Sequence, residues 1–543
     1  MRKTFLSSIT VILFVLIAAA VIGCSNSSVS NIYNKDEPRN HSMMNDNMGG
    51  MNGNMGMMDS KKNPYSQVTT NLPLAKKSQV VELNNGDNYQ MTAQIVAKEI
   101  NGKKVKMLAY NGMIPGPLLK VARGSTITIN FTNETDEEAM LHSHGVRLKN
   151  AFDGTNLTQK PIPIGGSFTY EVTFPDTGIY WYHPHLREDY TQELGLYGNY
   201  LVQSEDPDYW SPVNRELPLV IDDLILENGQ IAPFYKDQAD HALMGRYGNT
   251  VLVNGETEYQ LELTKGEVIR WYVTNVSNAR PYQFTIPGIR MKFVGGDASK
   301  MEQETFVESV IIAPSERAVL EVFFPEAGEY QLLNKNPEST MKLGTIIVSD
   351  GQPDISYADQ FNTSRTNKDV IAEIDPFRKY FDRPIDKSLE MTLQMGMMNG
   401  NMGMMMENES HKIEWEDEMG HMNANSTPDM ITWKLVDQAT GKSNMDIDWT
   451  FKKGEVVKIR LFNNPDSNHP MQHPIHLHGQ RFLVLETNGE RNKNLVWKDT
   501  ALIQTGDTVD ILVDMSNPGK WMIHCHIAEH LEADMMLGFE VLP

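Results

Sequence analysis

Histidine is concentrated in four short segments of this chain. Ten of the fifteen histidines lie in HSH from His142, HPH from His183, HPIHLH from His473 and HCHIAEH from His524. Neutral imidazole is the commonest metal ligand among protein side chains. A single histidine would be explained more simply as a core residue, but four clusters with a cysteine among them predict a centre of several metal ions.

The H-x-H spacing fits metal binding by β-strands. Residues i and i+2 of a strand point to the same face, so each pair can direct two imidazoles at one site. Cys525 lies between His524 and His526 and must point the opposite way from both. We therefore expect its thiolate to bind a different metal ion, joined to the histidine site by backbone bonds.

The residues around Cys525 indicate copper. His473, Cys525 and His530 provide two imidazoles and a thiolate, and Met535 is placed for a weak axial contact. This is the ligand set of a blue copper electron-transfer site. Zinc also binds cysteine and histidine, but the methionine and the remaining clustered histidines favour copper.

The motifs HSHG, YHPH, HPIHLHG and HCHIAEHLEADMM, in this order, resemble the ligand signatures of the three-domain multicopper oxidases. The resemblance covers about residues 80–543 apart from the methionine-rich segments, and it implies four copper ions: one type 1, one type 2 and a type 3 pair. The type 1 copper would be bound by His473, Cys525, His530 and Met535, and the type 2 copper by His142 and His476. The type 3 pair would be bound by His144, His183, His185, His478, His524 and His526.

The resemblance also implies an activity. Electrons taken singly from a reducing substrate would pass through Cys525 to His524 and His526, and dioxygen would be reduced to water. A copper-binding lipoprotein with an inactive oxidase scaffold is the non-enzyme alternative, and copper-dependent nitrite reduction is another. The complete ligand set argues against both.

Two positions depart from the family pattern. Ser143 stands where the family often has tryptophan, and Leu531 stands where several bacterial relatives carry a glutamate implicated in proton delivery. Asp153 matches an acid found near the type 2 copper in relatives and is the candidate proton relay. The alternative is that Asp153 is only a turn residue before Gly154.

Internal repeats predict the elements that carry these ligands. Each copy of the first repeat passes from a glycine turn into a strand that ends near an asparagine; the copies are LKVARGSTITINFTNET from Leu119, LELTKGEVIRWYVTNVS from Leu261 and WTFKKGEVVKIRLFNNP from Trp449. A second repeat aligns on Gly178, Gly328 and Gly519 and also ends in a strand. Two repeats in the same order indicate three homologous β-sandwich domains.

We therefore expect an all-β fold, which the resemblance specifies as three consecutive cupredoxin-like Greek-key β-sandwich domains. The expected ranges are 76–205 for domain one, 206–350 for domain two, 351–430 for a linker with a methionine-rich insertion, and 385–543 for domain three. Five residues after the aligned glycine, domain two has Leu333 where the other domains have His183 and His524. Domain two is therefore predicted to have no copper ligands.

The first residues have the pattern of an export signal. Arg2 and Lys3 precede an apolar run that ends in a lipobox with Cys24, so residues 1–23 would be a lipoprotein signal peptide and Cys24 the lipidated membrane anchor. An uncleaved transmembrane anchor is the alternative. We expect an exported lipoprotein on the outer face of a bacterial cytoplasmic membrane, with residues 24–75 as a flexible linker rich in methionine. Cys525 then has no disulfide partner.

Charge and methionine content indicate the substrate. The formal charge of −22 disfavours a nucleic-acid partner and favours cations. Residues 41–59 contain seven methionines and residues 391–430 contain eleven. Gly, Asn and Asp between the methionines prevent a packed core, so we expect both segments to be mobile. Thioether sulfur is a soft ligand that selects Cu(I). In the family, copper-tolerance oxidases have a methionine-rich insertion at the second of these places.

The sequence thus favours a Cu(I) oxidase serving copper tolerance, with Met471 and Glu532 at a metal-ion entry. The alternatives are that the tracts are solvated linkers that scavenge oxidants, and that the enzyme oxidises phenols, Fe(II) or Mn(II).

Overall fold

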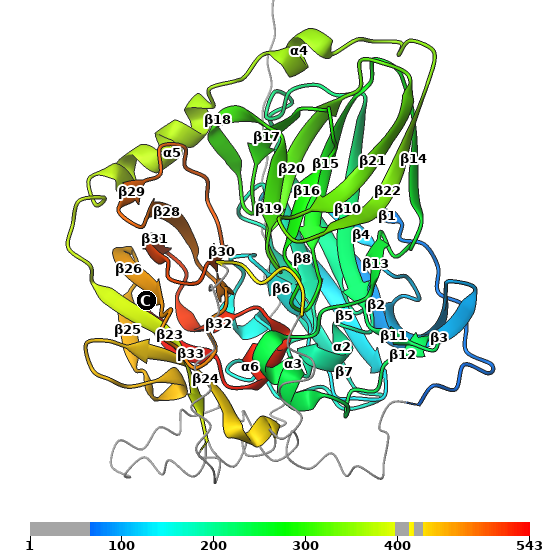
Figure 1. Cartoon of the computed structure of the whole chain (residues 1–543). Coiled ribbons are helices and arrows are strands. Elements are labelled where there is room, and N and C mark those ends of the chain that lie inside the picture. Colours follow the sequence, from blue (N-terminus) through cyan, green and yellow to red (C-terminus); the bar gives the residue numbers. More distant parts are fainter. Residues whose placement is uncertain (1–65, 397–411, 418–426) are drawn as a thin grey trace, which may run out of the picture. The chain divides into compact units, whose positions relative to one another are not determined.

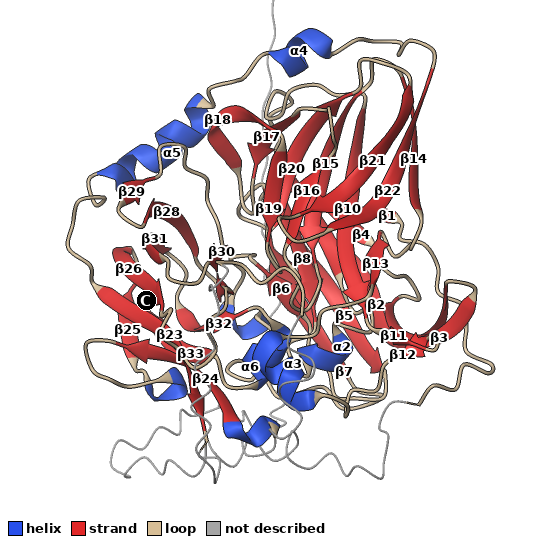
Figure 2. Cartoon of the chain, viewed as in Figure 1, coloured by secondary structure: helices blue, strands red, loops and turns tan. Residues whose placement is uncertain are grey.

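The chain folds mainly into β-strands, with a few short helices (Figure 2). The computed structural model describes residues 66–396, 412–417 and 427–543, all within the unit Met51–Pro543. The predicted signal peptide, Cys24 and the methionine-rich segment 41–59 lie outside the described residues. Within the described ranges, no helix is both long and apolar enough to cross a membrane.

Domain one has two sheets, ordered β1-β4-β9-β8-β6 and β3-β2-β5-β7 (Figure 1). Its strands are β1 (Val80–Leu83), β2 (Asn88–Ile100), β3 (Lys103–Tyr110), β4 (Leu118–Ala122), β5 (Thr126–Glu134), β6 (His142–His144), β7 (Ser167–Thr173), β8 (Gly178–His183) and β9 (Gly198–Gln203). The short helices η1 (Asn150–Phe152) and α2 (Glu188–Thr191) lie in its loops. Both sheets contribute side chains to one buried core.

Domain two has sheets ordered β13-β10-β15-β20-β17-β18 and β14-β22-β21-β16-β19, and a β11-β12 hairpin. Its strands are β10 (Arg215–Leu224), β11 (Leu226–Glu227), β12 (Gln230–Ile231), β13 (Thr250–Val253), β14 (Tyr259–Thr264), β15 (Val268–Asn275), β16 (Tyr282–Thr285), β17 (Met291–Gly295), β18 (Lys300–Val307), β19 (Ser309–Ile312), β20 (Arg317–Phe323), β21 (Gly328–Lys335) and β22 (Thr340–Ser349). Helix α3 (Gln238–Met244) follows the hairpin.

Domain three has sheets ordered β24-β23-β26-β31-β28-β29 and β25-β33-β32-β27-β30. Its elements are β23 (Lys387–Met395), η2 (Pro428–Met430), β24 (Ile431–Asp437), η3 (Asn444–Asp446), β25 (Trp449–Lys452), β26 (Glu455–Asn463), β27 (His473–Leu477), β28 (Arg481–Thr487), β29 (Glu490–Arg491), β30 (Thr500–Ile503), β31 (Thr508–Met515), β32 (Gly519–Cys525), α6 (Ala528–Glu532) and β33 (Met536–Leu542).

The sequence repeats correspond to one structural unit built three times. The first repeat forms β5, β15 and β26, and the second forms β8, β21 and β32. The asparagine at the end of each first-repeat strand is buried, and its side-chain amide donates to two carbonyl groups further along the same domain; these residues are Asn133, Asn275 and Asn463. Each asparagine therefore fastens the end of its strand, and the predicted all-β fold of three successive sandwiches is confirmed.

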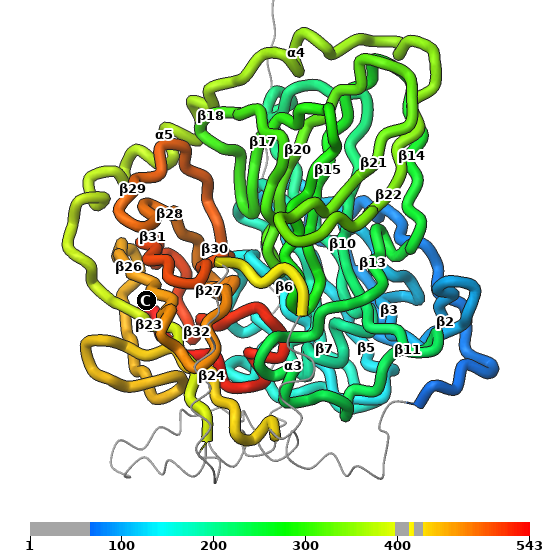
Figure 3. Tube along the Cα trace, viewed as in Figure 1, coloured from blue at the N-terminus to red at the C-terminus, as the bar shows by residue number. Residues whose placement is uncertain are grey.

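The range 351–430, predicted as a linker, is partly regular structure. The helices α4 (Ala358–Asn362) and α5 (Lys368–Arg378) lie between β22 and β23, as the chain path in Figure 3 shows. Val370 and Ile374 of α5 are buried, and β23 belongs to a sheet of domain three. Ile413 and Trp415, inside the methionine-rich insertion, are also buried, so the expectation that this insertion does not pack is wrong for residues 412–417.

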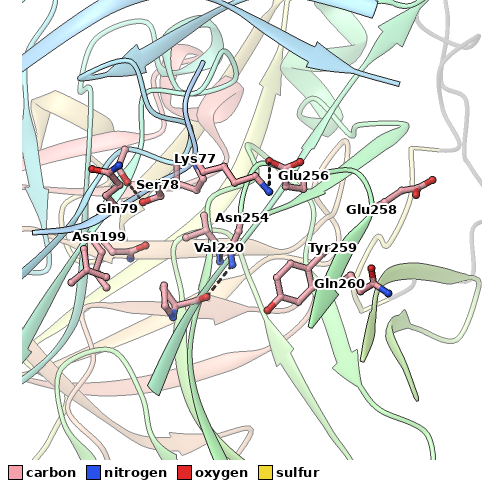
Figure 4. Close-up of a pocket in the computed structure, with 15 residues that line it drawn as sticks. Lys77, Ser78, Gln79, Asn199, Val220, Asn254, Glu256, Glu258, Tyr259 and Gln260 are labelled. Atoms are coloured by element: carbon pink, nitrogen blue, oxygen red, sulfur yellow. Dashed lines mark hydrogen bonds and ion pairs between the residues drawn. The ribbon is translucent and has the colours of Figure 1, made fainter. Parts of the chain in front are cut away.

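One cavity of about 470 Å³ lies between strands of domains one and two (Figure 4). Its lining includes Lys77, Asn199, Glu256 and Tyr259, and a Lys77 to Glu256 ion pair of 3.7 Å crosses it. None of the predicted metal ligands lines this cavity.

Candidate copper centre

Two strand pairs bring the histidine motifs together. In domain one, β6 pairs with β8 so that His142 lies opposite His183. In domain three, β27 pairs with β32 so that His476 lies opposite His524. Since alternate residues of a strand share a face, each pair presents several imidazoles on one side.

The eight histidines predicted to bind the type 2 and type 3 coppers form one buried cluster between domains one and three. The His144 and His476 rings stack at 3.6 Å, and the Nε2 atoms of His478 and His524 are 2.9 Å apart. Ligand atoms approach within 4.8 Å in several groups of three, among them His142 with His476 and His478. Each of the eight residues is at most 6% exposed.

Hydrogen bonds orient these imidazoles. Nδ1 of His142 donates to the Asp153 carbonyl at 2.7 Å, and Nδ1 of His476 donates to the Asp499 carbonyl at 2.9 Å. Nε2 of His144 donates to the Asp499 carboxylate at 3.1 Å. Because one nitrogen of each ring carries this proton, the other nitrogen has a free lone pair.

These remaining nitrogens are buried without a hydrogen-bond partner among the described residues. They include Nε2 of His142, Nδ1 of His144, Nε2 of His185 and Nε2 of His476. Burial and the neighbouring histidines hold the pKa values of His144 and His476 well below the ordinary value, so both rings stay neutral. Buried polar atoms are costly when unpartnered, and converging neutral imidazoles are what copper ions bind, so these residues fit the predicted metals.

The predicted type 1 ligands converge at a second buried point. Sγ of Cys525 lies 3.6 Å from Nδ1 of His473 and 3.6 Å from Nδ1 of His530. Nε2 of His530 donates to the Leu243 carbonyl of α3 at 3.0 Å, which fixes Nδ1 as the inward atom. Met535 is fully buried, and its carbonyl accepts the Cys525 N–H.

The thiol of Cys525 also fits a metal ligand. Burial raises its pKa above the ordinary value, so without a metal ion the group remains a thiol. A bound cation would displace this proton, as metal binding to cysteine requires. Cys525 therefore lies with the other predicted type 1 residues, His473 and His530. Its sequence neighbours His524 and His526 belong to the histidine cluster, as the alternation along a strand predicted.

Asp153 is placed at the histidine cluster. Its carboxylate lies 3.0 Å from Nδ1 of His478 and 3.4 Å from Nδ1 of His142, and the residue is 1% exposed. Burial alone would raise its pKa, but His478 and His142 more than offset this and lower the pKa below the ordinary value. The neighbouring Gly154 has φ of +77°, and a Cβ there would lie 2.0 Å from the Leu141 carbonyl oxygen. Asp153 is thus more than a turn residue, although its role as proton relay stays a prediction.

Met471 and Glu532, predicted at one metal-ion entry, have different neighbours. Met471 is 0% exposed and packs in the core of domain three. The Glu532 carboxylate accepts hydrogen bonds from backbone N–H groups of Arg187 and Glu188, next to α2, and burial raises its pKa to about 8. These contacts give the shared entry site no support.

Two acidic residues at the cluster were missed by sequence reasoning. Glu188 is fully buried, and its carboxylate lies 3.4 Å from Nδ1 of His185 and 3.8 Å from Nδ1 of His183. Its position three residues after His185 in the sequence was the available signal. Leu531 is buried and apolar, whereas Glu188 places a carboxyl group beside His183 and His185.

Asp499 is the second missed residue. Its carboxylate contacts His144 and forms a buried ion pair with Arg317 of β20 in domain two. Arg317 comes from domain two, where none of the predicted ligands lies, and it is 182 residues away from Asp499 in sequence. No local pattern in the sequence marks this pair.

Comparison with known proteins agrees with this geometry. Multicopper oxidase family models match residues 92–207, 226–351 and 416–543. The chain is 27% identical over 492 residues to a multicopper oxidase, mco, of Staphylococcus epidermidis, which covers 88% of this chain and 94% of that relative. It is 24% identical to the multicopper oxidase MmcO of Mycobacterium tuberculosis, over 82% of this chain and 85% of that relative.

A solved multicopper oxidase from Campylobacter jejuni aligns with a TM-score of 0.64 at 23% identity, over 89% of this chain and 100% of that one. This likeness supports the cupredoxin-like fold of the three domains. Family models that match in all three domains show that this chain belongs to the multicopper oxidase family and is a copper-dependent oxidoreductase that reduces dioxygen with electrons from a reducing substrate.

Proposed function

We propose that this enzyme oxidises Cu(I) at the cell surface and serves copper tolerance, with four copper ions bound by the residues assigned above. The supporting observation is the position of residues 412–417, in the middle of the methionine-rich insertion. The N–H of Glu414 donates to Oε1 of Gln472 at 2.8 Å, and Gln472 precedes the type 1 residue His473.

Domain two fixes the other side of this segment. Tyr247 donates its hydroxyl to the Glu414 carbonyl at 2.9 Å, and Arg280 donates to the Trp415 carbonyl and pairs with Glu416. Methionines precede and follow residues 412–417 in the sequence. Residues 412–417 of the insertion are therefore held by hydrogen bonds beside the predicted point of electron entry. The soft thioethers of the insertion would favour Cu(I) among possible substrates.

The bound coppers would supply one-electron acceptance and dioxygen reduction. The chain supplies a short covalent path, because Cys525 is bonded to both His524 and His526. Backbone carbonyls also accept hydrogen bonds from Nδ1 of His142 and Nδ1 of His476, which keeps each ring oriented. Lipidation at Cys24 would keep the enzyme at the outer face of the membrane.

Substitution is a sharper test than deletion. A deletion would remove buried Trp415 or cut β23, where Leu393 is buried. We suggest replacing by leucine all methionines in 397–411 and 418–426, with the matched replacement of those in 41–59 as control. Oxygen uptake would be measured with Cu(I) and with a phenol.

The expected result is a loss of Cu(I) turnover of at least tenfold in the 397–426 variant, with phenol turnover maintained or increased. Unchanged Cu(I) turnover in this variant would contradict the assigned role. Wild-type enzyme that oxidises a phenol or Fe(II) far faster than Cu(I) would replace the proposal with one of those activities, and copper binding without oxygen uptake would favour a binding protein.

A further inference from the structure

We infer that Glu188 is a positioning residue of the histidine cluster: its carboxyl group accepts hydrogen bonds from Nδ1 of His185 and Nδ1 of His183, and so directs Nε2 of both rings toward the copper ions. One oxygen faces each ring, with Oε1 at 3.4 Å from His185 and Oε2 at 3.8 Å from His183. Both separations are longer than a hydrogen bond, so we expect them to shorten when copper fixes the rings. The inference rests on the proposed assignment of these histidines as copper ligands and not on the identity of the substrate.

The Glu188 carboxyl group is buried in a place that leaves it without a hydrogen-bond partner. Its exposure is 0%, and neither oxygen is hydrogen-bonded to any of the described residues. A buried polar atom without a partner is costly and calls for an explanation. One oxygen of a carboxyl group can accept an imidazole N–H even when the other carries a proton, so the inferred contacts need no particular charge on Glu188.

His183 and His185 lack the orienting contacts that most of the cluster has. Five of the eight rings place one nitrogen at hydrogen-bond distance from an oxygen atom; they are His142, His144, His476, His478 and His524. For His183 and His185, Nε2 has no hydrogen-bond partner among the described residues, while Nδ1 faces Glu188. A carboxyl oxygen at Nδ1 keeps that nitrogen protonated and leaves the Nε2 lone pair for a metal ion.

The turn between His185 and α2 returns Glu188 to the histidines. Arg187 has φ of +51°, a left-handed conformation that is uncommon outside glycine. The N–H and the hydroxyl of Thr191 donate to the Arg187 carbonyl at 2.7 and 2.8 Å, and Nε of Arg187 donates to Asp189 at 2.9 Å. Backbone strain of this kind persists where surrounding contacts fix it. These contacts therefore hold Glu188 against both rings.

Glu188→Leu and Glu188→Gln test the inference in the copper-loaded enzyme. Leucine fills a similar space without an acceptor, whereas glutamine keeps one carbonyl oxygen that can serve one of the two rings. We expect a chelator to remove cluster copper at least tenfold more readily from Glu188→Leu than from wild type, within the range of about 10–100-fold known for residues that orient metal-binding histidines. The loss in Glu188→Gln should be smaller.

The readouts separate a positioning role from a structural one. Copper per chain and electron paramagnetic resonance would report the cluster, and the blue absorption of the type 1 site should persist. Urea unfolding of the copper-free protein is the further readout. Because Glu188→Leu removes an unpartnered buried carboxyl group, its urea midpoint should equal or exceed that of wild type. A residue needed only for folding would lower this midpoint.

Glu193→Gln is the matched control. Glu193 follows α2 and is 1% exposed, but its carboxylate accepts a hydrogen bond from Nε of Arg246 at 2.8 Å. Removing the charge of this buried pair should lower the urea midpoint of the copper-free protein. Copper retention should stay as in wild type, because Arg246 belongs to no predicted copper site.

Wild-type copper retention in Glu188→Leu would overturn the inference, as would equal copper losses in the leucine and glutamine variants. A lowered urea midpoint in copper-free Glu188→Leu would also overturn it. Failure of the proposed copper assignment is distinguishable, because wild-type enzyme would then bind copper at the type 1 residues alone. If Cu(I) is not the substrate, the copper retention of every variant remains as expected here.

Discussion

Replacing Arg317 should disturb the histidine cluster although none of the predicted copper ligands lies in domain two. Arg317 is fully buried, and its Nη1 donates to Oδ1 of Asp499 at 2.7 Å. The same Oδ1 accepts from Nε2 of His144 at 3.1 Å, and the Asp499 carbonyl accepts from His476. Arg317→Met would keep the length of the side chain and leave Asp499 buried without its cationic partner.

The size of the effect follows from the burial of this pair. Removing one partner of a buried ion pair costs about 3–5 kcal/mol. Burial raises the pKa of Asp499 and Arg317 opposes this rise, so in the variant the carboxyl group should take up a proton. Residues that orient metal-binding histidines typically change metal affinity or activity by about 10–100-fold when replaced.

The assay separates the two copper sites. Copper per chain would be measured by elemental analysis, the type 2 signal by electron paramagnetic resonance, and the type 1 site by its blue absorption. We expect Arg317→Met to lose cluster copper and oxygen uptake by tenfold or more. The blue absorption should persist, because His473, Cys525 and His530 all lie in domain three.

An exposed pair is the matched control. The Arg491 and Asp382 side chains are 54% and 81% exposed, and such pairs contribute about 0–1 kcal/mol. Arg491→Met should therefore leave copper content and oxygen uptake unchanged. Full cluster copper and an unaltered type 2 signal in Arg317→Met would refute the reasoning.

Three further predictions concern the same centre. Gly145→Ala should reduce copper content and stability, because φ is +79° and the new Cβ would lie 2.2 Å from the Asp499 carboxylate; Gly102→Ala, with φ of +73° and open space, should cost only about 1 kcal/mol in urea unfolding. Asp153→Asn should slow oxygen uptake without slowing anaerobic bleaching of the blue band by substrate, if its carboxylate relays protons; equal slowing of both would contradict this. Glu529→Gln should flatten the pH dependence of stability in the copper-free protein. Burial raises the pKa of Glu529 to about 8, so the unfolded chain binds fewer protons than the folded one above about pH 4.5, and stability falls by a few kcal/mol as pH rises to about 8. Urea midpoints that fall equally in wild type and variant over this range would argue against it.

The fold could be predicted because its determinants are local and repeated. Gly124, Gly266 and Gly454 all have positive φ, and each N–H donates to a carbonyl at the start of the second repeat. Together with the asparagines that fasten β5, β15 and β26, they leave the same residue types at the same spacing in each domain. A single sequence is enough to show such a pattern.

The candidate ligands could be predicted for a similar reason, because the two histidines of an H-x-H motif on a strand point to the same face. The residues that orient them could not. Arg317 reaches Asp499 across the domain boundary, and Glu414 reaches Gln472 from within a segment whose composition indicated no packing. Such contacts depend on how domains and loops meet, and no local period in the sequence records this.

Domain two thus contacts both groups of predicted copper ligands although it contains none of them. It gives each copper site one orienting contact: the Leu243 carbonyl holds His530, and Arg317 holds Asp499 against His144. A carbonyl and a buried cation can orient imidazoles without competing for the metal ion. We therefore expect substitutions on the inner surface of domain two to affect both predicted copper sites.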